Sequence, residues 1–304
     1  MPTRGKILVI RGGAIGDFIL TLPVLSALRE RFPEAQLEVL GYPNVTSLAV
    51  ASGLAHSSLS IESRALARFF APRVELDSQM RDYFGQFALI FSYLYDPDQF
   101  FETNVKSCFT GQFIAGPYRP SDEITHATDL FLTPLKALAI FDADPQPRLN
   151  LAAKEPLQGN WIALHPGSGS EKKNWPIEAW IEFARSLQIS RECNLLLVGG
   201  EAEGNKLEKL KALLDTERIK VLKGRPLVEV AQHLAACQPY IGHDSGMSHL
   251  AAALGLKGLI LWGETNASIW RPRSPKMQLL QAGAALQSLK ADRVLEVFDS
   301  TLGI

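Results

Sequence analysis

Several features that would place this chain in a special class of protein are missing from its 304 residues. Its three cysteines, Cys108, Cys193 and Cys237, are odd in number and far apart, which argues against a disulfide framework and a zinc site. Lysine and arginine (31 residues) nearly balance aspartate and glutamate (32), so no excess of positive charge indicates a nucleic-acid partner. H-E-x-x-H metal motifs and P-loops are absent as well. The sequence therefore predicts free thiols, no nucleic-acid binding, no metal site and no bound cofactor.

Long apolar runs are missing too. The sequence has no stretch of about 18 apolar residues that would cross a bilayer. The apolar segment 6–10 is too short for the core of a signal peptide. The overall composition, 46% hydrophobic and 21% charged, is ordinary for a soluble globular protein. We expect a cytoplasmic protein, and a peripheral contact with a membrane surface is compatible with this composition.

The chain does have a repeated alternation of short apolar runs and helix-like periodicity, which is typical of α/β proteins with parallel sheets. After the first run, Phe18, Leu22 and Leu25 recur at spacings of three and four and predict one apolar helix face. The predicted strands are 6–10, 37–40, 88–93, 113–115, 161–165, 194–198, 219–222, 239–241 and 258–262, and further helices are expected near 64–70, 128–141 and 284–302.

A segment with three prolines and no sustained periodicity, residues 142–160, interrupts this alternation and is the best candidate for a linker. It separates an N-terminal domain, residues 1–150, from a C-terminal domain, residues 151–304. The final helix packs either on its own domain or back on the first one. Glycine-containing turns follow several strands at their carboxyl ends, which is the edge of a parallel sheet where ligands bind.

The segment GHDSGMSHLAAALG, which begins at Gly242, joins a predicted strand to a helix of small residues. Such a junction presents unpaired backbone N–H groups and the positive end of a helix, so it predicts a phosphate or diphosphate site. Ser245 and Gly246 would bind the anion through their amides, and Ser245 also through its hydroxyl. Asp244 would repel phosphate, so we expect it to bond a sugar hydroxyl or to hold the turn. His249, one helical turn further on, either reaches the same ligand or is structural.

The segment RGGAIGD, which begins at Arg11, forms a second glycine-containing junction between a strand and a helix. Gly12, Gly13 and Gly16 lack the G-x-G-x-x-G spacing, which argues against a nicotinamide enzyme. These glycines serve either a close ligand or a tight turn. Arg11 either holds charge on an acceptor or pairs locally. Asp17, at the helix start, either acts as a general base towards an acceptor hydroxyl or caps the helix.

The loop HPGSGSEKKNWP, which begins at His165, carries the candidate cation of the second domain. Lys173 would neutralise charge on a departing diphosphate, and its alternative is a solvated surface lysine. Lys172, one residue away, competes with it for this role. Ser168 and Ser170 either donate hydroxyl hydrogen bonds to phosphate or cap a turn.

Two further polar residues stand at the ends of predicted strands. Glu201, in the turn VGGE, is placed to accept hydrogen bonds from ribose or sugar hydroxyls, or it is an acidic residue in the first turn of a helix. His165 precedes a proline at the end of its strand, and we expect it to be a packed structural residue.

These segments, in this order and spread over nearly the whole chain, resemble glycosyltransferase family 9, the ADP-heptose:lipopolysaccharide heptosyltransferases and their relatives. The resemblance rests on Arg11-x4-Gly16-Asp17, HPGSGSEKKNWP, VGGE and GHDSGMSHLAAALG. It implies the GT-B fold, in which two Rossmann-like domains with parallel sheets face each other across a cleft. It also implies that the N-terminal domain binds the acceptor and the C-terminal domain the nucleotide sugar, with Asp17 as the base and Lys173 as a phosphate-binding residue.

The implied activity is inverting, metal-independent transfer of a sugar to a hydroxyl of a bacterial surface-glycan or lipid-linked acceptor. The expected donor is ADP-heptose, Mg²⁺ is not expected to be required, and the expected protein is a monomer at the cytoplasmic face of the inner membrane. Few basic residues cluster in the N-terminal half, so a different glycan, a protein or a small molecule stays open as the acceptor. The alternatives are a non-catalytic nucleotide-sugar-binding or regulatory protein of the same fold and a GT-B-type UDP-sugar epimerase.

Overall fold

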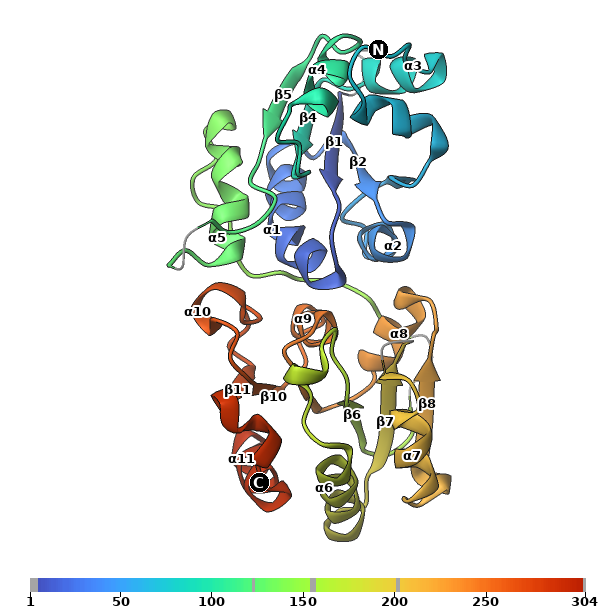
Figure 1. Ribbon diagram of the computed structural model, residues 1–304, viewed down its shortest axis with the longest axis vertical. Helices are drawn as coiled ribbons and strands as arrows, with labels where there is room; N and C mark the ends of the chain where they lie inside the picture. The colour runs from blue at the N-terminus through green and yellow to red at the C-terminus, as the bar shows by residue number, and fades with distance from the viewer. Residues whose placement is uncertain (1–4, 122–123, 154–156, 201–202, 303–304) are drawn as a thin grey trace. The chain divides into compact units, whose positions relative to one another are not determined.

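The computed structural model of the protein describes residues 5–121, 124–153, 157–200 and 203–302. Its internal contacts divide the chain into two compact units, Met1–Gln146 and Pro147–Ile304 (Figure 1). The division falls inside the proline-containing segment 142–160, just before the expected boundary at residue 150. Both units contain one parallel sheet with helices packed on it.

The first unit contains the strands β1 (Lys6–Arg11), β2 (Gln36–Gly41), β3 (Ser57–Ser60), β4 (Leu89–Ser92) and β5 (Gln112–Ala115). They form one sheet in the order β3-β2-β1-β4-β5, and all neighbouring pairs are parallel. In the centre, Ile10 of β1 lies opposite Leu40 of β2 and Ser92 of β4. The chain winds outward from β1 to β3 and then in the other direction from β4 to β5. This reversal makes the carboxyl ends of β1 and β4 the expected ligand site of the unit.

The helices of the first unit are α1 (Ile15–Arg31), α2 (Pro43–Ala51), the 3₁₀ segment η1 (Arg64–Phe70), α3 (Ser78–Gly85), α4 (Phe100–Lys106), α5 (Ala127–Leu132) and the 3₁₀ segment η2 (Thr133–Leu138). One face of the sheet, including Leu8 and Ile10, packs against an aromatic cluster from η1, α3 and α4. Its rings Phe69 and Phe84 lie 4.9 Å apart between centroids. The buried strand β1 is thereby held as a rigid support for the loop that follows it.

The second unit contains the strands β6 (Trp161–His165), β7 (Asn194–Gly199), β8 (Ile219–Lys223), β9 (Tyr240–His243), β10 (Gly258–Trp262) and β11 (Met277–Gln281). They form a parallel sheet in the order β11-β10-β9-β6-β7-β8. This is the strand order of a Rossmann fold, with the change of winding direction between β6 and β9. The carboxyl ends of β6 and β9 are therefore the expected ligand site of this unit.

The helices of the second unit are α6 (Ile177–Ser190), α7 (Lys206–Ala212), α8 (Leu227–Leu234), α9 (Gly246–Ala253), α10 (Ala267–Trp270) and α11 (Ala291–Leu302), with short 3₁₀ segments η3 (Glu171–Lys173), η5 (Thr216–Arg218) and η6 (Gly283–Ser288). The final helix α11 packs against α6, β10 and β11 of its own unit. Phe298 of α11 meets Phe183 of α6 edge to face, with 5.6 Å between ring centroids. The sequence left two placements of this final helix open, and in the structure the helix packs within the second unit.

The buried central strands lie where the sequence predicts them, and β6 and β10 match the predicted bounds. The sequence does not predict the edge strands β3 and β11, which have no fully buried residue, whereas the edge strands β5 and β8, with one buried residue each, are predicted. The prediction of a single helix over 128–141 is wrong, because α5 ends at Leu132 and η2 begins at Thr133. Pro134 has no amide hydrogen that could continue the α-helical hydrogen bonds. The expected helix 284–302 likewise divides into η6 and α11.

All three cysteines are free thiols, as the sequence predicts. Burial raises the pKa of each thiol, for Cys237 to about 12, so these groups are poor nucleophiles. Within the described ranges of the chain, no helix has both the length and the apolar character needed to span a membrane.

Candidate functional site

The two segments that leave β6 and β9 meet at the point where the second sheet changes its winding direction. The first segment runs from His165 to Lys173, and the second from His243 to Ser245. The ammonium of Lys173 lies 2.6 Å from Asp244 Oδ2. This ion pair joins positions 71 residues apart in the sequence. The structure therefore brings together the predicted cation and the predicted helix-start motif.

The Lys173–Asp244 pair is unequally exposed. The side chain of Lys173 is 40% exposed and that of Asp244 is 9% exposed. Asp244 is thus the buried partner of the pair. The ammonium of Lys173 remains partly exposed to solvent and has further N–H groups that can bind an anion. Lys172 is exposed on the 3₁₀ segment η3, whereas Lys173 is half-buried and paired with Asp244, so the geometry favours Lys173 over Lys172 as the site cation.

Ser245 is the N-cap residue of α9, and Gly246 is the first residue of that helix. Ser245 has an extended backbone, with φ −154° and ψ 163°. Within the part of the chain that the structure describes, no side chain caps the first turn of α9. The Ser248 amide already donates to the Ser245 carbonyl over 3.1 Å, so the amides available to an anion at the positive helix end are those of Ser245, Gly246 and Met247. His249, in the same turn of the helix, is buried at 6% exposure.

Hydrogen bonds between two serines stabilise the turn in the loop after β6. Ser168 Oγ donates to the carbonyl of Ser170 over 2.8 Å, and the Ser170 amide donates back to Ser168 Oγ over 3.3 Å. These contacts match the turn-capping alternative for both serines. The other residue expected on the donor side, Glu201, lies outside the described residues.

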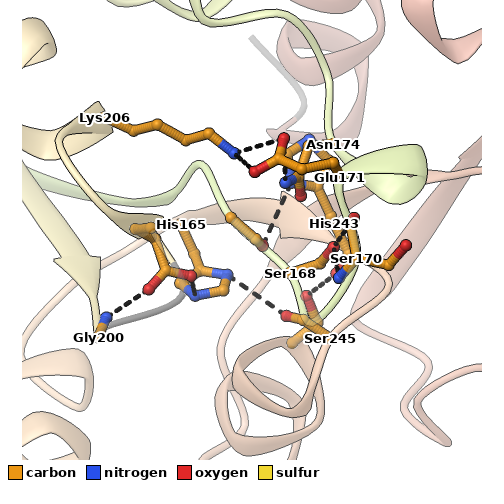
Figure 2. A network of polar contacts seen from close by, with 12 residues as sticks. His165, Ser168, Ser170, Glu171, Asn174, Gly200, Lys206, His243 and Ser245 are labelled. Carbon is orange, nitrogen blue, oxygen red and sulfur yellow. Dashed lines mark hydrogen bonds and ion pairs between the residues drawn. The ribbon is translucent and has the colours of Figure 1, made fainter.

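His243 ties the two parts of this loop together, a role that the sequence analysis missed. Its Nε2 accepts the Trp175 amide over 2.8 Å, and its Nδ1 lies 3.3 Å from the Gly167 carbonyl (Figure 2). Nε2 must be bare to accept, so the proton of the neutral ring is on Nδ1 and is donated to Gly167. Burial lowers the pKa of His243 to about 3. The imidazole is therefore neutral and acts as a fixed link between the two segments.

A second missed group is the chain of contacts Glu203–His165–Ser245 (Figure 2). His165 Nε2 lies 3.3 Å from Glu203 Oε1, and His165 Nδ1 lies 3.3 Å from Ser245 Oγ. The other carboxylate oxygen of Glu203 accepts the Gly200 amide. Burial by itself raises the pKa of Glu203, but the contacts with His165 and the Gly200 amide outweigh it and hold this pKa below its usual value. His165 is therefore more than a packed residue, because its ring connects a buried carboxylate to the helix-start serine.

In the first unit, Asp17 stands directly after β1 in the first turn of α1. It is the third helical residue rather than the N-cap, which is Ala14, and its Oδ2 accepts the Ala14 amide over 2.9 Å. This bond is one half of a capping box. The side chain remains 31% exposed. Asp17 thus caps the helix with one oxygen and still presents a carboxylate to solvent, so the capping and catalytic readings are compatible.

The glycines of this loop differ in how much space a side chain would find at each position. Gly13 has φ +99°, and a Cβ at this position would lie 2.8 Å from Asp17 Oδ2. A Cβ on Gly12 would meet only Leu94 Cδ2, at an ordinary 3.4 Å. Gly16 lies in the first turn of α1. Gly13 is therefore the glycine that the Asp17 geometry requires.

Arg11 is buried next to Asp17, and only 3% of it is exposed. Its Nη1 donates to the carbonyls of Tyr118 and Tyr93 over 2.8 and 3.2 Å, and its guanidinium lies 4.5 Å from the centre of the Phe131 ring. Its Nη2 is 3.7 Å from Asp17 Oδ1. Burial lowers the pKa of Arg11, against the opposing effect of the Asp17 charge. These contacts favour the local-pairing alternative over direct contact with an acceptor.

The sequence also contains two Asp-x-Asp triplets, at 96–98 and 142–144, which bear on the prediction of no metal site. Such triplets hold metal-bound diphosphates in glycosyltransferases of the GT-A class. Here the Asp96 carboxylate accepts the amides of Phe101 and Glu102 at the start of α4, and Asp144 accepts the Gln146 amide. Across the described ranges, no group of three or more His, Cys, Asp or Glu side chains is arranged to hold a metal ion.

Comparison with known proteins agrees with this arrangement. A model of glycosyltransferase family 9 (heptosyltransferase) matches residues 126–296, more than half of the chain. Lipooligosaccharide heptosyltransferase 2 of Campylobacter jejuni is 23% identical over 283 residues, which cover 86% of this chain and 83% of the relative. The structure of E. coli ADP-heptose LPS heptosyltransferase II matches with a TM-score of 0.79 at 18% identity, over 98% of both chains. E. coli heptosyltransferase WaaC with ADP matches with a TM-score of 0.77 at 17% identity, over 97% of this chain and 99% of that one. The chain has the GT-B fold and belongs to glycosyltransferase family 9.

Proposed function

We propose that this glycosyltransferase moves heptose from ADP-heptose to a hydroxyl group of a bacterial surface-glycan or lipid-linked acceptor, with inversion at the anomeric carbon. The second unit binds the donor, and the first unit supplies the base. Two family relatives support this donor class, since one is described as an ADP-heptose heptosyltransferase and another as bound to ADP. The lipooligosaccharide relative supports the acceptor class.

The observation that carries the proposal is the Lys173–Asp244 ion pair beside the open first turn of α9. When the bond between the sugar and the diphosphate breaks, the departing ADP gains negative charge. The ammonium of Lys173 is a fixed positive charge, and the amides of Ser245 and Gly246 are fixed dipoles that direct their positive ends outward. Both would stabilise the negative charge on the departing ADP. We propose that these groups supply the electrostatic stabilisation without a resident metal ion.

In the proposed reaction, the acceptor oxygen forms a bond to the anomeric carbon while the bond from that carbon to the β-phosphate oxygen breaks. The electron pair of the broken bond leaves with ADP. The proton of the acceptor hydroxyl goes to the carboxylate of Asp17, which is 31% exposed and fixed by the Ala14 amide. A single displacement of this kind inverts the anomeric centre.

The proposed setting follows from the acceptor. A surface glycan under assembly is presented at the cytoplasmic face of the inner membrane, so we propose that the protein works there, as a monomer in peripheral contact with the membrane.

The experiment is an assay of ADP release from ADP-heptose in the presence of lipooligosaccharide-type acceptors. We expect Asp17→Asn to lower kcat by at least about 100-fold, the usual contribution of a general base, while the Kd for ADP-heptose stays unchanged. Asp98→Asn, an exposed carboxylate change in the same unit, is the matched control. The assay is repeated with EDTA, which should leave the rate unchanged. Donor binding without turnover on any acceptor would instead indicate a non-catalytic nucleotide-sugar-binding protein, and full activity of Asp17→Asn would rule out the base.

A further inference from the structure

Two exposed tyrosines lie at the carboxyl edge of the first sheet and have no part in the proposed reaction as described so far. Tyr95 comes shortly after β4 and Tyr118 shortly after β5. Their ring centroids are 4.7 Å apart, and the ring planes are tilted by 52°. Tyr95 is 64% exposed and Tyr118 is 36% exposed. Two neighbouring aromatic rings in solvent are typical of a binding surface, because a ligand that covers them buries a large apolar area.

The tyrosine pair borders the proposed base. Arg11 Nη1 donates to the Tyr118 carbonyl over 2.8 Å, and Arg11 Nη2 is 3.7 Å from Asp17 Oδ1. The Tyr118 backbone and the Asp17 carboxylate therefore flank the same buried guanidinium. A ligand on the rings would lie at the same edge of the sheet as the carboxylate.

The backbone around Tyr95 is fixed on both sides. Its neighbour Leu94 packs on the loop between β1 and α1, since a Cβ on Gly12 would meet Leu94 Cδ2 at 3.4 Å. The next residue, Asp96, accepts two amides at the start of α4, over 3.2 and 2.9 Å. The exposed ring of Tyr95 is thus carried by a backbone that is held in position.

The segment of Tyr118 is fixed as closely. A Cβ on Gly116 would lie 2.6 Å from the ring of Tyr93, so this glycine lets the chain after β5 pack directly on that buried ring. The Tyr93 hydroxyl donates to the carbonyl of Phe131 over 2.8 Å. The guanidinium of Arg119 lies 5.3 Å from the centre of the Tyr118 ring, a cation–π contact. The two rings and this cation form a surface that is arranged before any ligand binds.

A pyranose ring has the chemistry that this surface would bind. One face of a pyranose carries C–H groups with a small positive charge, and the face of an aromatic ring is negative. The hydroxyl groups of the sugar project from its edge, where the N–H groups of a guanidinium such as that of Arg119 can donate to them. A sugar that stacks on Tyr95 therefore keeps a hydroxyl group available for Asp17.

We propose that Tyr95, supported by Tyr118, is a specificity-determining residue that stacks on a pyranose ring of the acceptor and holds a hydroxyl group of that ring towards Asp17. The acceptor is then a carbohydrate rather than a protein or an acyclic small molecule. Tyr95 contributes binding to the acceptor alone, and it breaks no bond and exchanges no proton. The inference rests on the proposed function, because it takes Asp17 as the base that receives the acceptor proton.

The first test measures ADP release by the full chain from ADP-heptose, with a deacylated lipooligosaccharide core as the soluble acceptor. Tyr95→Ala should raise the KM for this acceptor about tenfold, the size of one aromatic stacking contact, and leave kcat and the Kd for ADP-heptose unchanged. Tyr95→Phe keeps the ring and should retain the wild-type KM. Phe141→Ala removes a 74% exposed ring from the same unit, and this matched control should equal the wild type.

The second test detects the contact without turnover, by saturation-transfer NMR on the same oligosaccharide. Saturation of the aromatic protons of the protein should pass to C–H protons of a sugar ring in the wild type and in Phe141→Ala. The transfer should fall in Tyr95→Ala and persist in Tyr95→Phe, because only the first variant lacks the ring.

An unchanged acceptor KM in Tyr95→Ala, or saturation transfer equal to that of the wild type, would overturn the inference and leave the proposed function intact. A change confined to kcat or to the Kd for ADP-heptose would overturn it as well, because the ring would then act elsewhere than on the acceptor. Absence of ADP release by the folded wild type would contradict the proposed function, whereas saturation transfer that depends on the Tyr95 ring would still support the sugar subsite.

Discussion

Single residues in the proposed donor site each have two roles. Lys173 is partly exposed yet paired with Asp244, which is 9% exposed, so the lysine is positioned before any ligand arrives. An ion pair with such an exposed partner contributes little to stability. In the proposed site, the pair fixes the direction of the ammonium, which would remove part of the ordering cost when an anion binds.

The first prediction concerns this lysine. Lys173→Met keeps most of the aliphatic side chain but removes the charge opposite the departing diphosphate, so kcat/KM for the donor should fall by about 100-fold. Lys172→Met, an exposed neighbour on η3, should retain nearly the wild-type value. Steady-state kinetics of ADP release measures both. Equal losses of kcat/KM in the two variants would mean that the total positive charge of the loop, rather than the position of the Lys173 ammonium, determines the rate.

A second residue-scale prediction follows from His243. Its folded-state pKa of about 3 lies below the ordinary value of 6.5, because the ring is buried. Between these pH values the unfolded chain binds a proton that the folded chain does not, so the free energy of unfolding falls as pH falls, by about 1.4 kcal/mol per unit. From pH 6.5 to 5.0, the wild type should lose about 2 kcal/mol more than His243→Asn, which does not titrate. Urea denaturation at several pH values measures the difference. Parallel stability curves would contradict the neutral, buried imidazole.

At the scale of elements, the predicted site residues of each unit lie at strand ends and at the helix starts that follow them. The Asp17 loop follows β1, the Lys173 loop follows β6, and Ser245 follows β9. Each of these strands is central in its sheet and buried, so each is an apolar run that the sequence reveals. The edge strands β3 and β11 lack this signal because none of their residues is fully buried, unlike the edge strands β5 and β8, which each have one buried apolar residue.

The third prediction belongs to the turn between β1 and α1. Gly13→Ala places a Cβ 2.8 Å from Asp17 Oδ2 in a backbone with φ +99°, so it should displace the carboxylate and lower turnover. The backbone strain alone should cost about 1 kcal/mol of stability. Gly53→Ala shares a positive φ, +74°, but its Cβ would meet no described atom within 4 Å. That control should lose stability without losing turnover. Turnover equal to wild type in Gly13→Ala would show that Asp17 need not be held in this position.

At the scale of the whole molecule, two units with separate cores make up the chain. Family membership places the chain among the glycosyltransferases, and the assay of ADP release distinguishes an active enzyme from a non-catalytic protein of the same fold. All of its tryptophans lie in the second unit: Trp161, Trp175, Trp180, Trp262 and Trp270. Tryptophan fluorescence therefore reports on unfolding of the second unit.

The fourth prediction uses this property. Phe298 is fully buried between α11 and α6, so Phe298→Ala should destabilise the second unit by about 3–5 kcal/mol. The urea midpoint followed by tryptophan fluorescence should fall accordingly. Glu296→Ala, on an exposed position of the same helix, should leave the midpoint nearly unchanged. An unchanged midpoint in Phe298→Ala would mean that α11 does not belong to the core of the second unit.

The sequence by itself determined the fold class, the central strands and the local motifs around Asp17, Lys173 and Ser245, because each depends on periodicity or on neighbours a few residues away. Only the tertiary structure decided that Asp244 faces Lys173, that His243 joins Gly167 to Trp175, and that Glu203 lies behind His165. These partners are separated by 38 to 76 residues in the sequence. No local pattern encodes such contacts, since they arise only when parallel strands bring their carboxyl ends to the same edge of a sheet.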